Sequence, residues 1–441
     1  MSGAMCHSRQ RPSPSWLFST LSVLILAGCA ISAPAPVPES PSTSETALQD
    51  PTDIAAQVHD RMLILDAHAD IVPLGVSSRY GDADGSSKVT PQKLRAGGVD
   101  VVVMAAAVGP GPRNAAGDAA ARAQVDAELQ ALEQIAASDD QIVIARSVAE
   151  LQRAHAAGQQ AFLMGFQNAR ALEGKVESLD ELYAAGVRVF ALTHIGHNEF
   201  ADSSRPEFIS AAAAYEPIER HGGLSVLGQH AVARINALGG LVDVSQLSKK
   251  ATLQAIASSS QPVIASHSNV QTLSDVARNL SDEEIDAIGR SGGVMHIAAF
   301  TPYLLDLSAP DLIDEIKALR RSAGIDEHYT YPYELYWEID DEKAQYAFLG
   351  AMRTLIGPAN IDRLIDHVDY LVERIGIDHV GLATDFNHGG GITGFENAAK
   401  ARNLTAGLLR RGYSETQISK IWSGNFLRVL AQAEQGRSPP D

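Results

Sequence analysis

Leu63-Ile64-Leu65-Asp66-Ala67-His68-Ala69-Asp70 is an apolar run that predicts a buried strand ending in two side chains able to bind a metal ion. On a strand, residues two positions apart share a face, so the His68 imidazole and the Asp70 carboxylate can reach one cation. A second His-x-Asp, His367 to Asp369, lies in a run whose apolar residues have helical spacing. Residues two apart on a helix point to different sides, so we expect that pair not to chelate a metal.

Eight such apolar, β-rich runs follow one another along the chain, and helical stretches with start and stop signals lie between them. The predicted strands are residues 62–67, 99–107, 161–166, 187–193, 240–245, 262–266, 292–298 and 379–384. Capping patterns mark helices at residues 90–97, 147–158, 178–186 and 281–289. Eight such units in a chain of this length favour a (β/α)8 barrel, the TIM barrel, and a doubly wound open sheet is the main alternative because alternation alone does not reveal closure.

The beginning of the chain predicts export. Within residues 1–29, an apolar run from Trp16 to Ala27 ends in Leu26-Ala27-Gly28-Cys29, which resembles the lipobox of a bacterial lipoprotein signal peptide. We therefore expect a lipid on Cys29, which would anchor the chain to the outer membrane with its folded part facing the periplasm. A soluble secreted or periplasmic protein is the alternative.

The remaining boundaries follow from composition. Residues 30–52 are rich in Pro and Ser and predict a tether, and residues 53–435 predict one barrel domain. An insertion rich in Tyr, Asp and Glu is expected at residues 300–360, and residues 436–441 are a short tail.

Several function classes are excluded by composition. The formal net charge of -18 disfavours nucleic acid, because phosphate binding needs clustered Lys and Arg. Cys6 and Cys29 are the only cysteines, so the barrel has neither a disulfide nor a thiolate nucleophile. No Gly-x-Ser-x-Gly motif accompanies the strands, which argues against a serine hydrolase.

Polar side chains follow six of the eight predicted strands, at the end where barrel enzymes carry their chemistry. They are His68, Asp70, Gln167, His194, Gln246, His267 and Asp385. A single histidine at a strand end is usually structural, but recurrence on six strands predicts a functional site at this mouth.

The motifs around these residues resemble those of the membrane dipeptidase family, also called the renal dipeptidase family, within the amidohydrolase superfamily. The resemblance covers about residues 55–433 and implies a TIM barrel of the metal-dependent hydrolase type. It is carried by Asp66-Ala67-His68-Ala69-Asp70, by Leu192-Thr193-His194 with Asn198 and Ala201-Asp202, by Gly223-Leu224-Ser225-x-x-Gly228, by Ser266-His267-Ser268 with Ala277-Arg278-Asn279, and by Thr384-Asp385-Phe386.

The resemblance implies a role for each matching residue. His68, Asp70 and Asp385 match the ligands of a first metal ion, and His267 matches a ligand of a second. His194 matches the histidine that contacts the substrate carbonyl, which suits a donor to a developing oxyanion.

Arg278 matches the arginine that holds the substrate carboxylate, a role that suits a guanidinium fork. A structural alternative is that Arg278 pairs with acids at the start of the helix near Asp282 to Glu284.

Two departures from the family fall on the second metal. Gln167 stands where the family bridges its metals with Glu, and Gln246 stands where a second histidine is expected. Two divalent ions about 4 Å apart repel by roughly 17 kcal/mol at an effective dielectric near 20, and a neutral amide does not offset that repulsion. We therefore expect one firmly bound ion, Zn²⁺ first among candidates, and a second that is weak or absent.

The sequence thus predicts a metal-dependent dipeptidase in which His194 stabilises the oxyanion, Arg278 orients the substrate and Asp385 passes a proton to the leaving amine. Two alternatives stay open. One is a peptide-binding homologue without catalysis, and the other is a related hydrolase of a different small amide, ester or lactone. The oligomeric state is also open, with a homodimer as one alternative.

Four further signals have structural interpretations. We expect Gly389-Gly390-Gly391 to form a turn near the mouth, since it lacks the Gly-Lys-Ser/Thr ending of a phosphate loop. His197 and Glu199 are interpreted as loop residues and His296 as structural. His388 has no partner at ligand spacing and receives no role.

Overall fold

The structure of this chain is a computed structural model, which describes residues 51–438 except 210–211, 213 and 325–340. The expected signal segment therefore lies outside the described residues, as does nearly all of the tether. The first described element, α1 (Pro51–His59), is a helix. Among the described residues, none of the helices combines the length and apolar character that a membrane-spanning segment needs.

Eight parallel strands form a barrel in the order β1-β2-β4-β5-β8-β9-β10-β11. Their bounds are β1 (Leu65–Asp70), β2 (Val101–Ala107), β4 (Gln160–Gln167), β5 (Val187–Ala191), β8 (Leu241–Asp243), β9 (Ile264–Ala265), β10 (Val294–Ala298) and β11 (Val380–Ala383). Each of the eight predicted strands is present, and all neighbours pair in parallel, as expected of runs that are buried on both faces.

The barrel closes between its first and last strands. The backbone amide of Asp385 donates to the carbonyl of His68 at 3.0 Å, and the amide of Asp70 donates to Phe386 at 2.9 Å. This closure decides between the two predicted architectures, because a doubly wound sheet would leave both edge strands unpaired. The prediction of a (β/α)8 barrel is confirmed.

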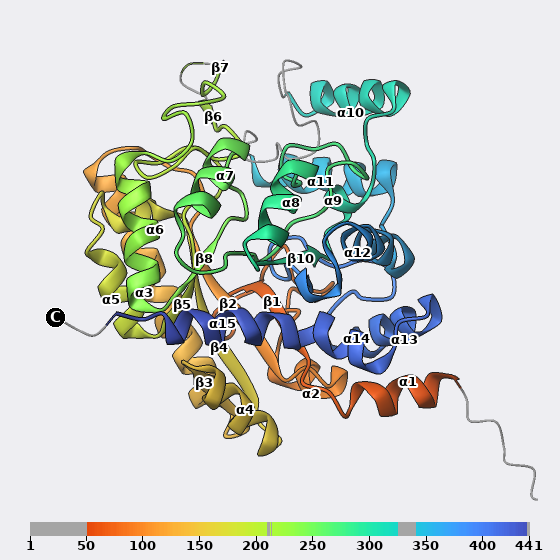
Figure 1. Cartoon of the computed structure of the whole chain (residues 1–441). Coiled ribbons are helices and arrows are strands. Elements are labelled where there is room, and N and C mark those ends of the chain that lie inside the picture. The colour runs from red at the N-terminus through yellow and green to blue at the C-terminus, as the bar shows by residue number, and fades with distance from the viewer. Residues whose placement is uncertain (1–50, 210–211, 213, 325–340, 439–441) are drawn as a thin grey trace, which may run out of the picture. The chain divides into compact units, whose positions relative to one another are not determined.

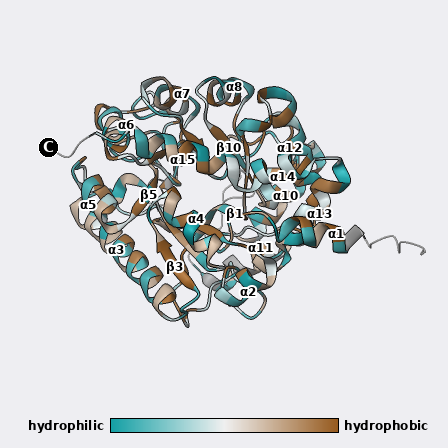
Figure 2. Ribbon diagram, turned by 60° about the horizontal axis from the view of Figure 1, so that its bottom comes forward, coloured by the Kyte–Doolittle hydropathy of each residue, from teal (hydrophilic) through white to brown (hydrophobic). Residues whose placement is uncertain are grey.

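Helices surround the barrel, as Figures 1 and 2 show. Those in the first half are α2 (Pro91–Gly97), α3 (Ala115–Ala137), α4 (Val148–Ala156), α5 (Ser178–Ala185), α6 (Val226–Leu238) and α7 (Lys249–Ser258). Those that follow are α8 (Asp282–Arg290), α12 (Ile361–Ile375), α13 (Ala401–Arg411), α14 (Glu415–Ser419) and α15 (Asn425–Gln435).

Most capping signals mark helix ends where the sequence predicted them. Thr90 and Ser147 cap α2 and α4 through their side chains, and Ser281 forms a capping box with Glu284 at α8. The helix predicted at residues 178–186 is present as α5, but Ser178 is its first residue rather than its cap, and the Ser178 hydroxyl donates to the carbonyl of Leu172. The hydroxyl that the pattern assigned to a cap is instead bound to a carbonyl oxygen six residues earlier in the chain.

One strand of the main sheet escaped prediction. Strand β3 (Ile142–Ala145) pairs in parallel with the beginning of β4, where β5 does not yet reach. It lies off the barrel path and lengthens the sheet at that point.

The two ends of the barrel differ. At the amino end, Phe426, Val429 and Leu430 of α15 pack in one apolar cluster with strand residues such as Leu65 and Val294. In Figure 1 this helix crosses the view horizontally, with α2, β3 and α4 below it. The carboxyl end of the barrel carries the polar residues instead.

The expected insertion lies between β10 and β11. It contains α9 (Thr301–Leu304), α10 (Pro310–Ser322) and α11 (Glu342–Ile356), which have their own small core of Tyr303, Ile316, Phe348 and Met352. A short hairpin of β6 (Phe208–Ile209) and β7 (Ala214–Tyr215) lies in the connection after β5. In Figure 1 this hairpin and α10 project from the upper side.

Candidate metal centre at the barrel mouth

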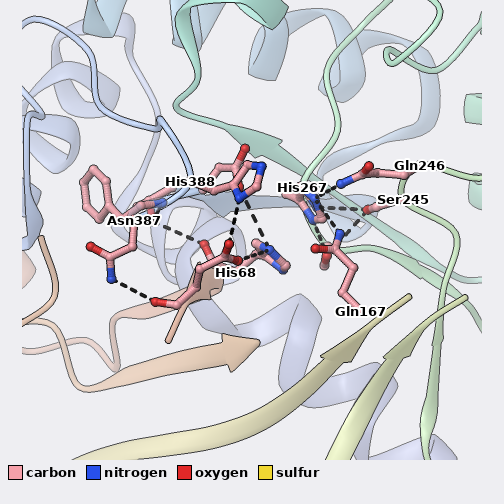
Figure 3. Close-up of polar contacts among 12 residues, drawn as sticks. His68, Gln167, Ser245, Gln246, His267, Asn387 and His388 are labelled. Atoms are coloured by element: carbon pink, nitrogen blue, oxygen red, sulfur yellow. Dashed lines mark hydrogen bonds and ion pairs between the residues drawn. The ribbon is translucent and has the colours of Figure 1, made fainter. Parts of the chain in front are cut away.

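The polar residues predicted from the strand ends converge at the carboxyl end of the barrel. His68, Gln167, His194, Gln246, His267 and Asp385 are all buried, and Asp70 is nearly so. Figure 3 shows His68 beside His267, with the side chains of Gln167 and Gln246 directed at His267.

Three of these residues form a group suited to a cation. The ligand atoms of His68, His267 and Asp385 lie within 4.8 Å of one another, and no other such group occurs in the described part of the chain. His68 Nε2 is 3.4 Å from Asp70 Oδ1 and 4.0 Å from Asp385 Oδ1. The imidazoles of His68 and His267 stack with their centres 3.7 Å apart.

Two aspartates, Asp66 and Asp243, hold the strand ends in place through the same pattern of hydrogen bonds. Asp66 Oδ1 accepts from the backbone amides of His68 at 3.2 Å and Thr384 at 2.9 Å, while Oδ2 accepts from the Thr384 hydroxyl. Thr384 directly precedes Asp385, so one carboxylate positions residues from β1 and β11.

Asp243 repeats this arrangement on the other side of the barrel. Its Oδ1 accepts from the amides of Ser245 and Ser266, each at 2.9 Å, and its Oδ2 accepts from the Ser266 hydroxyl. Ser266 directly precedes His267. The two carboxylates thus tie together the four strand ends that carry most of the site.

The backbone is strained where the side chains turn into the mouth. Among the described residues, Asn168, Gln246, Asp385 and Asn387 have φ between 54° and 90°, a region that non-glycine residues rarely adopt. The predicted glycine turn follows: a Cβ on Gly390 would lie 2.1 Å from the carbonyl oxygen of Thr384, so only glycine fits.

The titratable side chains at the barrel mouth fall into a charged set and a neutral set. Burial alone would lower the pKa of His68, but the carboxylates of Asp70 and Asp385 raise it above its ordinary value. Burial would raise the pKa of Asp70, yet His388 and His68 hold it well below its usual range. Asp70 is therefore ionised, and its Oδ1 has no hydrogen-bond partner among the described residues.

His194 and His267 are neutral instead. Burial, with the charges of His388 and Arg205, lowers the pKa of His194 well below 6.5, and burial next to His68 does the same for His267. Within the described residues, neither ring nitrogen of His194 has a hydrogen-bond partner. A buried imidazole left in that state has a free donor for a ligand in the mouth.

The two glutamines at the departures from the family contact the same atom. Gln167 Nε2 is 3.3 Å and Gln246 Nε2 is 3.2 Å from Nε2 of His267. The other ring nitrogen, Nδ1, is 2.7 Å from the Ser266 hydroxyl. Since that hydroxyl donates to Asp243, His267 carries its proton on Nδ1 and presents a lone pair at Nε2.

Arg278 is buried against the strand that carries His267. Its guanidinium donates to the Ser268 hydroxyl at 2.9 Å and to the carbonyl of His267, and it lies over the ring of Tyr303. The acids near the helix start are engaged elsewhere: Asp282 pairs with Arg374, and Glu284 accepts from Ser281.

His388 belongs to the site although sequence reasoning gave it no role. Its Nδ1 donates to Asp70 Oδ2 at 2.8 Å. Its ring packs edge to face against the ring of His194, with the ring centres 4.9 Å apart. The turn through Asp385 and Asn387, both with positive φ, brings it back toward β1. The glycines after it were the one sequence signal of such a turn.

Other histidines have the structural roles that we expected. His197 bonds the carbonyl of Pro217 and the amide of Ser203, and His296 bonds the carbonyl of Ala265. Glu199 pairs with Arg220.

The second His-x-Asp does not converge on a common point. His367 is buried against Val270 and Leu304, whereas Asp369 faces Arg411 and Tyr413. The expectation that this helical pair does not chelate is confirmed.

A cavity of about 370 Å³ adjoins the site, within the range typical of small-molecule pockets. His388 and Arg205 line its polar side. Its apolar wall comes from the insertion, through Phe300, Tyr303, Leu349, Met352 and Ile356.

Comparisons with known proteins identify relatives of this arrangement. The family model described as membrane dipeptidase (peptidase family M19) matches residues 52–439. Dipeptidase tcpJ of Claviceps purpurea is 29% identical over 299 residues, which are 67% of this chain and 56% of that protein. Dipeptidase aclJ of Aspergillus oryzae is 30% identical over 301 residues, 67% of this chain and 57% of its own length. The chain thus spans little more than half the length of these curated relatives.

Solved structures agree in fold. The probable dipeptidase PvdM of Pseudomonas aeruginosa is 34% identical, with a TM-score of 0.77 over 88% of this chain and 99% of its own. A Rhodobacter sphaeroides metallo peptidase liganded with a phosphinate mimic of the dipeptide L-Ala-D-Ala is 20% identical, with a TM-score of 0.63 over 84% of this chain and 99% of its own. At that identity, the second likeness concerns the fold alone.

Proposed function

Since the chain belongs to the membrane dipeptidase family, we propose that it hydrolyses the peptide bond of dipeptides with the help of one firmly bound divalent metal ion. The observation that supports this most directly is the convergence of buried His and Asp side chains at the carboxyl end of a closed barrel. The curated relatives are named dipeptidases, which points to the same substrate class.

His68, Asp70 and Asp385 would hold the ion, and the donor set fits zinc because it combines an imidazole with two carboxylates. His267, although close to His68 and Asp385, is left out of this set because its Nε2 faces the amide groups of Gln167 and Gln246. His388 would act on this set indirectly, since its hydrogen bond orients Asp70. A divalent ion bound there supplies a Lewis acid that brings the pKa of water close to neutrality.

The remaining groups act on the substrate. His194 is neutral, so it can donate one N–H to the scissile carbonyl oxygen as negative charge develops there. Arg278 would bind the terminal carboxylate, since its guanidinium lies at the same mouth and matches a carboxylate in shape. Asp385 would accept a proton from water and pass it to the leaving amine.

A panel of dipeptides, including members with a D-residue at the carboxyl end, tests this proposal. The zinc-supplemented protein is expected to hydrolyse at least one member, and His68→Ala with Asp385→Asn is expected to lose that turnover. Saturable binding of a dipeptide without turnover would instead identify a peptide-binding homologue. Turnover restricted to another small amide, ester or lactone would identify the remaining alternative.

We also propose that the chain is exported and anchored by a lipid at Cys29, on the sequence of residues 1–29. In bacteria, the wild-type chain is then expected in the outer-membrane fraction, and Cys29→Ser is expected to be released from it. Equal distribution of the two proteins between fractions would contradict the anchor and leave the dipeptidase proposal untouched.

A further inference from the structure

Arg205 is a buried arginine in the connection between β5 and β6, and its side chain reaches the barrel mouth. One guanidinium nitrogen, Nη2, donates to Oε1 of Gln246, and Nη1 donates to the hydroxyl of Tyr303 at 3.1 Å. Arg205 also lines the cavity together with His388. A positive charge is thus fixed beside Gln246, the residue that replaces a histidine ligand of the second metal.

The contact with Arg205 determines how Gln246 is oriented. A guanidinium has only donors, so Gln246 must turn its oxygen toward Arg205 and its NH₂ group toward the rest of the site. That NH₂ group faces Nε2 of His267, and the NH₂ group of Gln167 faces the same lone pair. The one strong ligand left for a second ion is therefore covered by two amide donors.

The donor set at this position does not fit a second cation. Neither glutamine directs an oxygen at His267, neither carries a negative charge, and the nearby arginine repels a cation. The charge of Arg205 also reaches the substrate side of the mouth, since it adds to burial and the charge of His388 in lowering the pKa of His194.

We propose that Arg205 takes the place of the second metal ion: it turns the oxygen of Gln246 away from His267 and supplies positive charge beside His194 for the oxyanion that develops on the scissile carbonyl. This inference rests on the proposed dipeptidase function for the identity of the oxyanion. The exclusion of a second cation does not depend on turnover and can be measured separately.

Metal binding tests the exclusion. Gln167→Glu with Gln246→His rebuilds the ligands that the family resemblance implies, and the same protein with Arg205→Met also loses the fixed charge. Zinc per chain is measured in both proteins by elemental analysis after dialysis against a series of zinc buffers. The protein without Arg205 is expected to bind its second ion at least tenfold more tightly, and equal second-ion affinity, including none in either protein, would overturn the inference.

Kinetics test the role toward the oxyanion. In the otherwise unaltered chain, Arg205→Met is expected to lower kcat about 100-fold with little change in KM or zinc content. Arg205→Lys keeps the charge and is expected to recover at least a tenth of the wild-type kcat. Unchanged kcat in Arg205→Met, or equal loss in both variants, would contradict this role.

A matched control separates charge at the mouth from the loss of any buried arginine. Arg188 is buried at the beginning of β5, at the opposite end of the barrel, where it donates to the carbonyls of Arg146 and Tyr183. Arg188→Met is expected to lower the melting temperature as Arg205→Met does and to leave kcat unchanged. Absence of turnover in the wild type would refute the dipeptidase proposal, while the zinc measurement would still decide whether Arg205 excludes a second ion.

Discussion

The protonation of each histidine at the barrel mouth determines whether a ring nitrogen can donate or accept a hydrogen bond. His267 carries its proton on Nδ1, where it donates to Ser266, and so keeps a lone pair at Nε2. His194 is also neutral, but no described group takes up its N–H, which leaves a donor for a substrate oxygen. Residues of one type thus have different roles because their neighbours differ.

Replacement of Arg278 tests carboxylate recognition. We expect Arg278→Met to raise KM for dipeptides about 10- to 100-fold, since a charge-assisted hydrogen bond contributes about 1.5–3 kcal/mol. Steady-state kinetics of the zinc-loaded protein measure this, with Arg188→Met as the control for loss of a buried arginine. If KM is unchanged in Arg278→Met, the carboxylate role is wrong.

Replacement of His388 tests whether its hydrogen bond to Asp70 positions that metal ligand. Its hydrogen bond to Asp70 fixes one carboxylate oxygen, so His388→Ala is expected to weaken zinc affinity about 10- to 100-fold. Competition with a coloured chelator measures the affinity. His230→Ala on the exposed side of α6 serves as control, and equal zinc affinity of the two variants would refute a positioning role for His388.

At the scale of elements, strand ends were predictable and the loops between them were not. The unbroken apolar runs predicted all eight barrel strands, and the residues that follow them predicted the end of the barrel at which the polar side chains converge. Strand β3 was missed because Ile142–Ala145 is only four residues long and lies between two helices.

Arg205 and His388 were missed for a different reason. Both lie in loops, where no periodic pattern indicates a side chain's direction, and each reaches the mouth only through long-range contacts. The Asp243 carboxylate likewise joins Ser266 across 23 positions of sequence, a link that only the closed barrel creates.

The turn after β11 requires glycine at position 390, and substitution of this residue tests that requirement. Gly390→Ala would place its Cβ against the carbonyl oxygen of Thr384, so we expect a loss of about 1–3 kcal/mol in stability and weaker zinc retention. Gly350→Ala in α11 meets nothing within 4 Å and is expected to stabilise by about 0.5–1 kcal/mol. Denaturant unfolding compares the two, and a Gly390→Ala protein as stable as the wild type would show that the turn adapts.

For the molecule as a whole, burial of neutral histidines predicts sensitivity to acid. His59 joins α1 to the rest of the barrel: Nδ1 accepts from the Thr405 hydroxyl at 2.7 Å, and Nε2 donates to the Gly98 carbonyl at 3.2 Å. Burial, with the charge of Arg402, lowers the pKa of His59 to about 4. The unfolded chain takes up this proton near pH 6.5, so the stabilisation is full above that pH and is lost as the pH falls toward 4.

His59→Gln isolates this contribution, because glutamine can keep both hydrogen bonds but does not titrate. Unfolding free energies measured at pH 7.5 and pH 5 should show the wild type losing about 2 kcal/mol more than the variant. The comparison with the variant is needed because burial raises the pKa of Glu128 to about 7, which makes stability change with pH in the opposite direction. Equal losses of unfolding free energy in both proteins would show that protonation of His59 does not destabilise the fold.

The proposed chemistry depends on a single ion held by His68, Asp70 and Asp385 and not by His267. Elemental analysis of zinc after extensive dialysis tests this in the wild type, in His68→Ala and in His267→Ala. We predict one ion per chain in the wild type, none in His68→Ala and one in His267→Ala. Two tightly held ions in the wild type, or one retained by His68→Ala, would contradict the account.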